Sequence, residues 1–98
     1  MPTAAATPTA APTRAVAITK AASERGERYF LLNGCFACHG PAGEGYIGPR
    51  LAGTGLPYES VLNQVRSPQT SRMPRFAAAA LTDDAVADIY AFLRSLRP

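Results

Sequence analysis

The clearest pattern of hydrophobic and polar positions lies near the C-terminus of the chain. Thr82 has the side chain of an N-cap, two aspartates follow it, and arginines stand near the other end, as the helix dipole favours. Between these ends, apolar side chains recur at the spacing of one helical face, at Val86, Ile89, Tyr90, Leu93 and Leu96. The pattern predicts an amphipathic helix over residues 83–96 whose apolar stripe faces the core.

A second helical pattern begins at about Ser23, which also has an N-cap side chain, and it carries Tyr29 and Phe30 on its apolar face. Gly26 lies inside this pattern, although a glycine in a helix interior costs about 1 kcal/mol relative to alanine. We therefore expect another helix to cross closely over Gly26. The Asn-Gly pair at 33–34 ends the helix.

A third helix is expected after Pro57, because proline suits a first helical turn. The apolar positions that follow have helical spacing, at Tyr58, Val61, Leu62 and Val65. Pro68 stops the pattern. Residues 40–49 are rich in Gly and Pro and predict a loop, and residues 69–80 are irregular apart from an alanine run that fits a short turn. The chain as a whole predicts a small all-α fold with about three to four helices.

The N-terminal tail has a different composition. Residues 1–13 contain only Ala, Thr and Pro besides the initiating Met. Such a segment has little apolar area to bury, and its prolines prevent a continuous helix. Since proline-containing linkers are extended and semi-rigid, we interpret residues 1–22 as a linker or tether, and residues 23–98 as a single domain. A plain disordered end is compatible with this interpretation.

The candidate chemistry of the domain lies where Cys35 and Cys38 are followed directly by His39. One helical turn brings residues three apart onto one face. Two thiols on one face can both bond to one edge of a porphyrin, and the adjacent imidazole can then ligate its iron. The spacing therefore indicates haem c, covalently attached through the two cysteines, with one iron.

Three other uses of these residues are less favoured. A thioredoxin-like redox pair needs a βαβ context, which the surrounding helix and glycine loop do not provide. A structural zinc site usually takes four side-chain ligands, but the chain has two Cys and one His, so a carboxylate would have to complete it. A disulfide between Cys35 and Cys38 would close a loop too short to constrain much of the unfolded chain.

Met73 is the candidate for a second iron ligand. Apart from Met1 it is the only Met in the chain, and His39 is the only His. With the usual ligands, His/Met ligation can therefore be made in one way. Met73 could instead fill the core, as flexible methionines often do. Its place in a loop beside Pro74, away from any helical stripe, favours ligation.

Charge narrows the classes of partner. The chain has a formal charge of +3, but two of its basic residues, Arg14 and Lys20, lie in the tail. Residues 23–98 therefore carry eight basic and seven acidic side chains (10 − 2 against 7), and no basic run with interleaved aromatics is present. We expect no binding to nucleic acid.

No stretch reaches the ~18 apolar residues that a membrane-spanning helix needs, and the N-terminus lacks the features of a signal peptide. Haem is attached to such motifs outside the bacterial cytoplasm. We therefore expect the natural precursor to carry an export signal or an anchor. The expected location is the periplasmic side of the cytoplasmic membrane, with the domain tethered to the membrane or to another domain.

Residues 23–97 resemble the class I monohaem cytochromes c of bacteria. The resemblance rests on the 35–39 motif, on the Gly-Pro-Arg-Leu-Ala-Gly segment at 48–53, and on the Arg-Met-Pro-Arg-Phe segment at 72–76. It implies that the first and last helices cross, with Gly26 at the crossing. It also implies that the Pro49 carbonyl accepts a hydrogen bond from His39, and that Met73 is the second axial ligand.

The haem propionates would need polar partners. Four side chains have the right chemistry, namely Tyr46, Arg50, Tyr58 and Arg66. The two arginines are preferred among them.

Two classes of function follow from a haem c domain. The first is a one-electron carrier in a respiratory chain, which is not itself an enzyme and takes electrons from a donor such as a quinol-oxidising complex to a terminal oxidase or reductase. The second is a peroxidase-like enzyme or a gas or redox sensor with an open distal site. The second needs Met73 to be off the iron and a distal acid–base residue, for which the chain has no second His. The electron carrier is the favoured interpretation.

Overall fold

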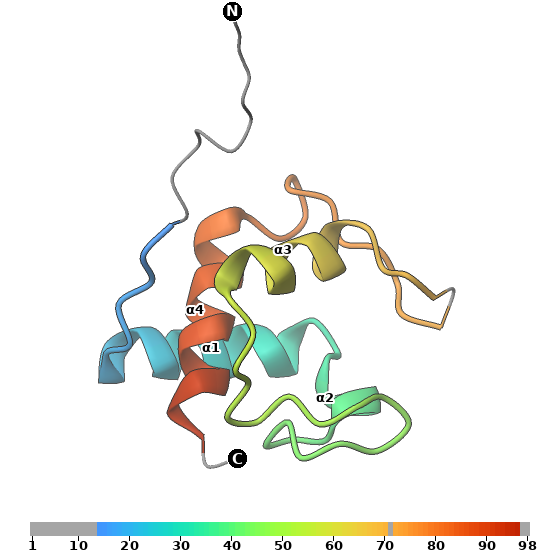
Figure 1. The fold of residues 1–98 in the computed structure, drawn as a ribbon, viewed down its shortest axis with the longest axis horizontal. Coiled ribbons are helices and arrows are strands. Elements are labelled where there is room, and N and C mark those ends of the chain that lie inside the picture. Colours follow the sequence, from blue (N-terminus) through green and yellow to red (C-terminus); the bar gives the residue numbers. More distant parts are fainter. Residues whose placement is uncertain (1–13, 71, 97–98) are drawn as a thin grey trace, which may run out of the picture.

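The computed structural model describes residues 14–70 and 72–96, and within them the fold is helical with no strand. Its helices are α1 (Lys20–Leu32), α2 (Phe36–His39), α3 (Tyr58–Arg66) and α4 (Asp83–Ser95). Figure 1 shows α1 and α4 crossing, with α3 on one side of the crossing and the short α2 at the end of α1. The expected all-α fold is confirmed.

The crossing of α1 and α4 is close because Gly26 has no side chain. A Cβ atom at position 26 would lie 1.9 Å from the carbonyl oxygen of Asp88 in α4. Arg25 donates to the Asp88 carboxylate from Nε at 2.9 Å, which holds the two helices together at the edge of the crossing. The expected role of Gly26 is thus confirmed.

The core lies between α1 and α4. The largest fully buried side chains are Phe30 of α1 and Val86 of α4, with exposed fractions of 1% and 0%. The ring of Phe30 packs against that of Phe92, with 5.5 Å between the ring centroids. Because α4 is apolar over most of its circumference, it also packs against α3, where Tyr58 meets Tyr90 edge to face.

The start of α1 differs from the expectation. The helix begins at Lys20, and its N-cap is Thr19, whose hydroxyl accepts a hydrogen bond from the Ala22 amide at 3.0 Å. The predicted N-cap at Ser23 is therefore wrong. The Ser23 hydroxyl instead faces α4 and donates to the carbonyl of Ala91 at 3.3 Å. The other predicted helices are found, with α4 ending at Ser95 and α3 beginning directly after Pro57.

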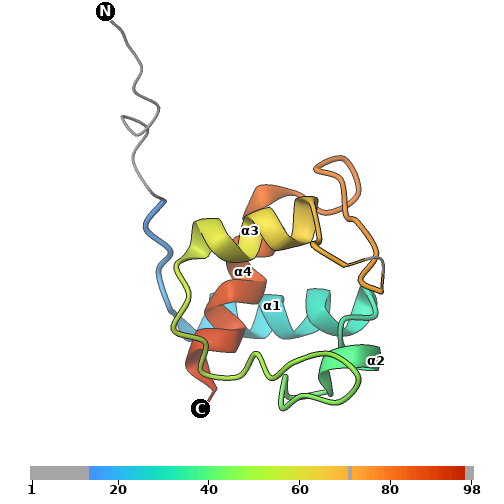
Figure 2. The ribbon, with the colours of Figure 1, turned by 45° about the vertical axis from the view of Figure 1, so that its right-hand side comes forward.

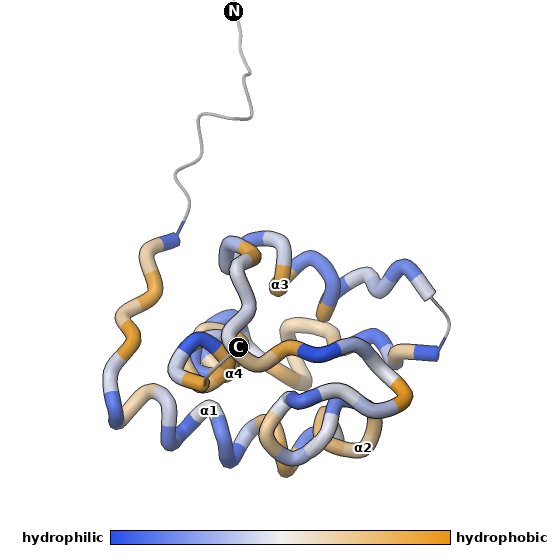
Figure 3. Tube along the Cα trace, turned by 60° about the horizontal axis from the view of Figure 1, so that its bottom comes forward, coloured by the Kyte–Doolittle hydropathy of each residue, from blue (hydrophilic) through white to orange (hydrophobic). Residues whose placement is uncertain are grey.

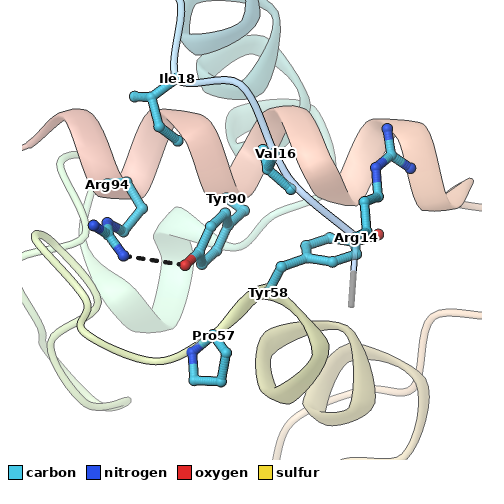
Figure 4. A pocket seen from close by; sticks show the side chains of 7 residues that line it. All are labelled: Arg14, Val16, Ile18, Pro57, Tyr58, Tyr90 and Arg94. Carbon is cyan, nitrogen blue, oxygen red and sulfur yellow. Dashed lines mark hydrogen bonds between the residues drawn. The ribbon is translucent and has the colours of Figure 1, made fainter. Parts of the chain in front are cut away.

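Residues 14–18 lie across α4 toward the start of α3 (Figure 4). Val16 packs against the hydrophobic core, and the Arg14 guanidinium lies over the Tyr58 ring and pairs with Asp84 at 2.9 Å. The Arg14 amide donates to the carboxylate of Glu59 at 3.2 Å. The described part of the expected linker therefore contacts the helices, while residues 1–13 lie outside the described residues and their role as a linker stays a prediction.

We predict that Gly26→Ala lowers the stability of the haem-loaded protein, although alanine is the better helix former by about 1 kcal/mol. The clash with the α4 backbone should outweigh this gain and cost about 2–3 kcal/mol in the free energy of unfolding. The measurement is guanidinium unfolding followed by circular dichroism. Gly55→Ala is the matched control, because a Cβ there meets nothing within 4 Å. A Gly26→Ala protein as stable as the parent would contradict the close crossing.

Candidate functional site

The first part of the site is α2, which α1 positions. The amide of Cys35 donates to the carbonyl of Phe30 at 3.1 Å, and the amide of His39 donates to the carbonyl of Cys35 at 3.0 Å. The motif thus follows from the end of α1 as one further helical turn. Cys35 and Cys38 are both half-buried, with their thiols free of any disulfide. The helical spacing expected of the two cysteines is present.

The electrostatics of Cys35 bear on the alternative redox use. Burial raises the pKa of the Cys35 thiol. Thiols that exchange disulfides have a lowered pKa, because the thiolate is the nucleophile. The direction of the shift therefore argues against a thioredoxin-like pair. Among the residues that the structure describes, no three His, Cys, Asp or Glu side chains gather as a set of metal ligands.

The second part of the site is the loop after α2, which orients His39. The Nδ1 atom of His39 lies 2.8 Å from the carbonyl oxygen of Pro49. Since a carbonyl can only accept, Nδ1 carries the proton and Nε2 keeps its lone pair for a metal. The hydrogen bond that the resemblance implied is present.

The loop is held against α2 by its backbone. The Gly45 amide donates to the carbonyl of His39, and the Gly48 amide to the carbonyl of Cys38, both at 2.7 Å. Gly48 also leaves room for the imidazole, because a Cβ at this position would lie 2.8 Å from Cε1 of His39. The glycines of this loop therefore allow close contact with the histidine as well as a turn.

The third part of the site is the loop that carries Met73. Met73 is half-buried, and its Sδ atom lies 3.6 Å from Nε2 of Gln64 in α3. The same loop is attached to α3 further along, where the amide of Phe76 donates to the carbonyl of Val65 at 3.0 Å. Sequence reasoning did not single out Gln64. The sequence signal that could have identified Gln64 is its position near the C-terminal end of α3, which is the end nearer to Met73 along the chain.

Two of the expected propionate partners, Tyr58 and Arg66, make their contacts with Asp83. The Tyr58 hydroxyl donates to the backbone carbonyl of Asp83 at 3.0 Å, and the Arg66 guanidinium pairs with the Asp83 carboxylate. Arg66 also donates to the carbonyl of Phe76 at 3.0 Å. Both side chains are therefore used to join α3 to the start of α4. The polar groups of Tyr58 and Arg66 are thus engaged within the protein, and both side chains meet at Asp83.

The remaining two lie on the loop beside His39. Tyr46 has 78% of its surface exposed, and Arg50, directly after Pro49, is exposed as well.

Apolar side chains are also exposed around α2. Leu32 at the end of α1 is 81% exposed, Ile47 is 65% exposed and Phe36 is 42% exposed. Figure 3 shows hydrophobic segments at α2 and in the loop that follows it.

The residues present fit a covalently bound iron porphyrin. Two thiols stand one helical turn apart. The imidazole beside them is held by the bond from Nδ1 to the Pro49 carbonyl, which leaves Nε2 available. A thioether sulfur is held on a separate loop. Figure 2 shows α2 and its loop on one side and α3 with the Met73 loop on the other. Nitrogen and sulfur donors from two segments are the ligands that haem iron takes in electron carriers.

Comparison with known proteins assigns the chain to a family. The family described as cytochrome c oxidase, cbb3-type, subunit III matches residues 21–93. A protein of Synechocystis sp. called "Cytochrome c-553-like" is 35% identical over 79 residues, which cover 79% of this chain and 71% of that protein. No solved structure matches.

The chain therefore belongs to the class I monohaem cytochromes c. Its cofactor is haem c, covalently bound and containing one iron, and its chemistry is electron transfer. Proteins of this family are typically extracytoplasmic. Within the described residues, no helix has both the length and the apolar character needed to cross a membrane.

We predict that Gly48→Ala disturbs the orientation of His39. The new Cβ should displace the imidazole and weaken the bond from Nδ1 to Pro49, which costs about 1 kcal/mol of stability. Because such a bond would make a ligating imidazole a stronger donor to iron, its loss should raise the reduction potential. Redox titration and electron paramagnetic resonance of the ferric protein measure this, with Gly55→Ala as the control. An unchanged potential and spectrum would show that Gly48 does not constrain the histidine.

Proposed function

We propose that this chain is a one-electron carrier whose haem is attached through Cys35 and Cys38 and whose iron is ligated by His39 and Met73. The observation that carries the proposal is the 2.8 Å contact between Nδ1 of His39 and the Pro49 carbonyl, because it leaves Nε2 available on a fixed ring. When bound, haem c supplies an iron that alternates between the ferric and ferrous states.

Each protein group has a separate task in this proposal. The two thiols form thioether bonds and hold the cofactor permanently. Pro49 fixes the tautomer and the direction of His39. The thioether of Met73 is a soft ligand and favours the ferrous state, which raises the potential relative to a second imidazole. Because the ligands are held on preformed segments, little has to rearrange when the charge changes.

A peroxidase-like enzyme or a gas sensor is the second candidate. It requires Met73 to leave the distal side, and it requires an acid–base group there. Two contacts from α3 oppose this, because Gln64 contacts the Met73 sulfur and Arg66 donates a hydrogen bond to the Phe76 carbonyl of the same loop. The electron carrier accounts for both contacts, so we favour it.

The proposed setting is a respiratory chain on the periplasmic side of a bacterial membrane. A quinol-oxidising complex would be the donor, and a terminal oxidase or reductase the acceptor. The matching family, whose description is that of a subunit of a cbb3-type oxidase, supports a domain that works within such a complex. Residues 1–13 would then be the tether that joins the domain to the membrane or to a neighbouring domain.

The ligation is tested by Met73→His. The ferric parent should be low-spin and show a sulfur-to-iron charge-transfer band in the far red. The variant should stay low-spin, lose this band and have a lower potential, since imidazole lacks the preference of the thioether for ferrous iron. Optical spectra and redox titration measure both. A variant with the band and potential of the parent would place the ligand elsewhere.

The proposed docking face includes the Met73 loop, where Arg72 and Arg75 are exposed. We predict that Arg72→Glu/Arg75→Glu slows oxidation by anionic ferricyanide several-fold at low salt. The effect should shrink as salt shortens the screening length from about 10 Å at 0.1 M.

Lys20→Glu/Arg94→Glu is the control, because it changes the net charge by the same amount as the first double reversal. Its two positions lie at the start of α1 and near the end of α4. A rate that responds equally to both double reversals would show only a net-charge effect. A rate insensitive to salt and to both reversals would remove the arginines as the contact and leave the apolar side chains around α2, such as Leu32 and Ile47.

A further inference from the structure

The segment before α1 follows the surface of the helices as an extended chain. Its alternate residues Arg14, Val16 and Ile18 line a cavity of about 270 Å³ between the segment and the helices. Ala15 and Ala17, which lie between them, are exposed. Side chains that alternate between two faces are typical of extended backbone. The rest of the cavity is lined from α4 and the start of α3, by Pro57, Tyr58, Tyr90 and Arg94 (Figure 4).

Two residues on the inner face of this segment hold it in place. Val16 is half-buried and packs against the hydrophobic core. Arg14 reaches the first turns of two helices, because its guanidinium pairs with Asp84 of α4 at 2.9 Å and its amide donates to Glu59 of α3 at 3.2 Å. Exposed ion pairs contribute little free energy, so we expect Val16 to supply most of the binding and Arg14 to fix the position.

The cap of α1 does not explain these contacts. The Thr19 hydroxyl accepts from the Ala22 amide, and this cap requires an extended residue only at position 19. Arg14 lies five positions earlier, and a helix cap gives no reason for it to reach α3 and α4. The segment is therefore bound by its own side chains.

The segment and the candidate haem ligands lie on opposite sides of the domain. Figures 1 and 2 show residues 14–18 on one side, and α2 and the Met73 loop on the other. The contacts agree with these views. Arg14 meets the first turn of α3, whereas Gln64 and Arg66, at the other end of α3, contact the Met73 loop. The point at which residue 13 is attached is thus remote from the candidate haem ligands.

We propose that residues 14–18 are an N-terminal clamp, which binds the surface formed by α4 and the start of α3 and makes the tether leave the domain on the side opposite to the haem. The inference rests on the proposed tether at residues 1–13. If the clamp were released, its five residues would add about 17 Å of extended chain, and the domain could turn freely about Thr19. While the clamp is bound, the haem side points away from the anchor and stays open to a redox partner.

The Arg14–Ala15 bond is a natural reporter of the clamp, because trypsin cleaves after arginine. When release and binding are fast, a protease cuts a bound segment in proportion to the fraction that is released, so we expect the haem-loaded parent to be cut about tenfold or more slowly than a synthetic peptide of residues 9–19. Val16→Ser should bring the rate close to that of a peptide with the same change. Ala17→Ser, at an exposed position, is the matched control and should keep the protection. Mass spectrometry measures the cleavage.

A second variant leaves the core untouched. The Asp84 side chain is 86% exposed, so Asp84→Asn removes the ion pair to Arg14 without a change in packing. It should speed cleavage after Arg14 by about two- to fivefold, as expected for an exposed pair. This variant decides the matter if Val16→Ser fails to fold.

The direction of the clamp is tested with a nitroxide on Ala15→Cys in the haem-loaded ferrous protein. Because Ala15 is exposed, the label leaves the inner face of the segment intact. Nuclear magnetic resonance should show broadened amide lines at Glu59 and Asp84, and sharp lines at Gly45 in the loop after α2. When Val16→Ser is added, the broadening at Glu59 and Asp84 should weaken and spread over the domain.

A parent that is cut as fast as the peptide, or broadened evenly over the domain, would overturn the clamp. Full protection in both Val16→Ser and Asp84→Asn would overturn the contacts assigned to it, and equal loss of protection in Val16→Ser and Ala17→Ser would do the same. A parent without the far-red sulfur-to-iron band would contradict ligation by Met73, but the tryptic rates would still decide the clamp. The two failures are therefore distinguishable.

Discussion

The close crossing of α1 over α4 at Gly26 is the constraint on which the rest of the structure depends. A side chain at this point would overlap the α4 backbone at Asp88, so only glycine lets the helices approach so far. The approach allows Phe30 to pack against Phe92 in the core. From Phe30, one backbone hydrogen bond leads to Cys35, and the next turn presents His39. The attachment motif is therefore positioned by the core, through the hydrogen-bonded turn that joins α1 to α2.

The other half of the site depends on α4 in a different way. Tyr58 and Arg66 join α3 to Asp83, the first residue of α4. The end of α3 then holds the Met73 loop through Phe76 and through the methionine sulfur. Both halves of the site are thus positioned by contacts that lead to α4. This arrangement suits an electron carrier, because ligands that keep their positions in both oxidation states lower the rearrangement that accompanies each transfer.

The exposed surface around the site is mixed in chemistry. Apolar side chains surround α2, while two arginines flank Met73 on the opposite loop. An apolar surface contributes to binding once water is displaced, whereas charges mainly steer the approach of a partner. A redox partner that meets both regions would be guided by the arginines and held by the apolar contacts.

Much of the fold and site could be predicted because it is encoded locally. The apolar stripe of α4 and the spacing of Cys35, Cys38 and His39 each lie within a few helical turns, where periodicity and side-chain chemistry are sufficient. Gly26 was informative because a glycine inside a helix needs an explanation from packing. The segment at 48–53 was informative through its resemblance to a family. Each of these signals can be interpreted without knowing which segments meet.

The tertiary structure decided what depends on distance between segments. Thr19 and Ser23 are both suitable N-caps, but in the folded chain Thr19 caps the helix while the Ser23 hydroxyl donates to the Ala91 carbonyl of α4. Arg66 and Tyr58 have the chemistry of propionate partners, yet Asp83 lies close enough to engage both. Gln64 has no distinctive sequence context, and its contact with the Met73 sulfur, nine positions away, depends on how α3 and the loop pack. The sequence identifies the reactive side chains, but the packing of the helices determines which neighbours those side chains contact.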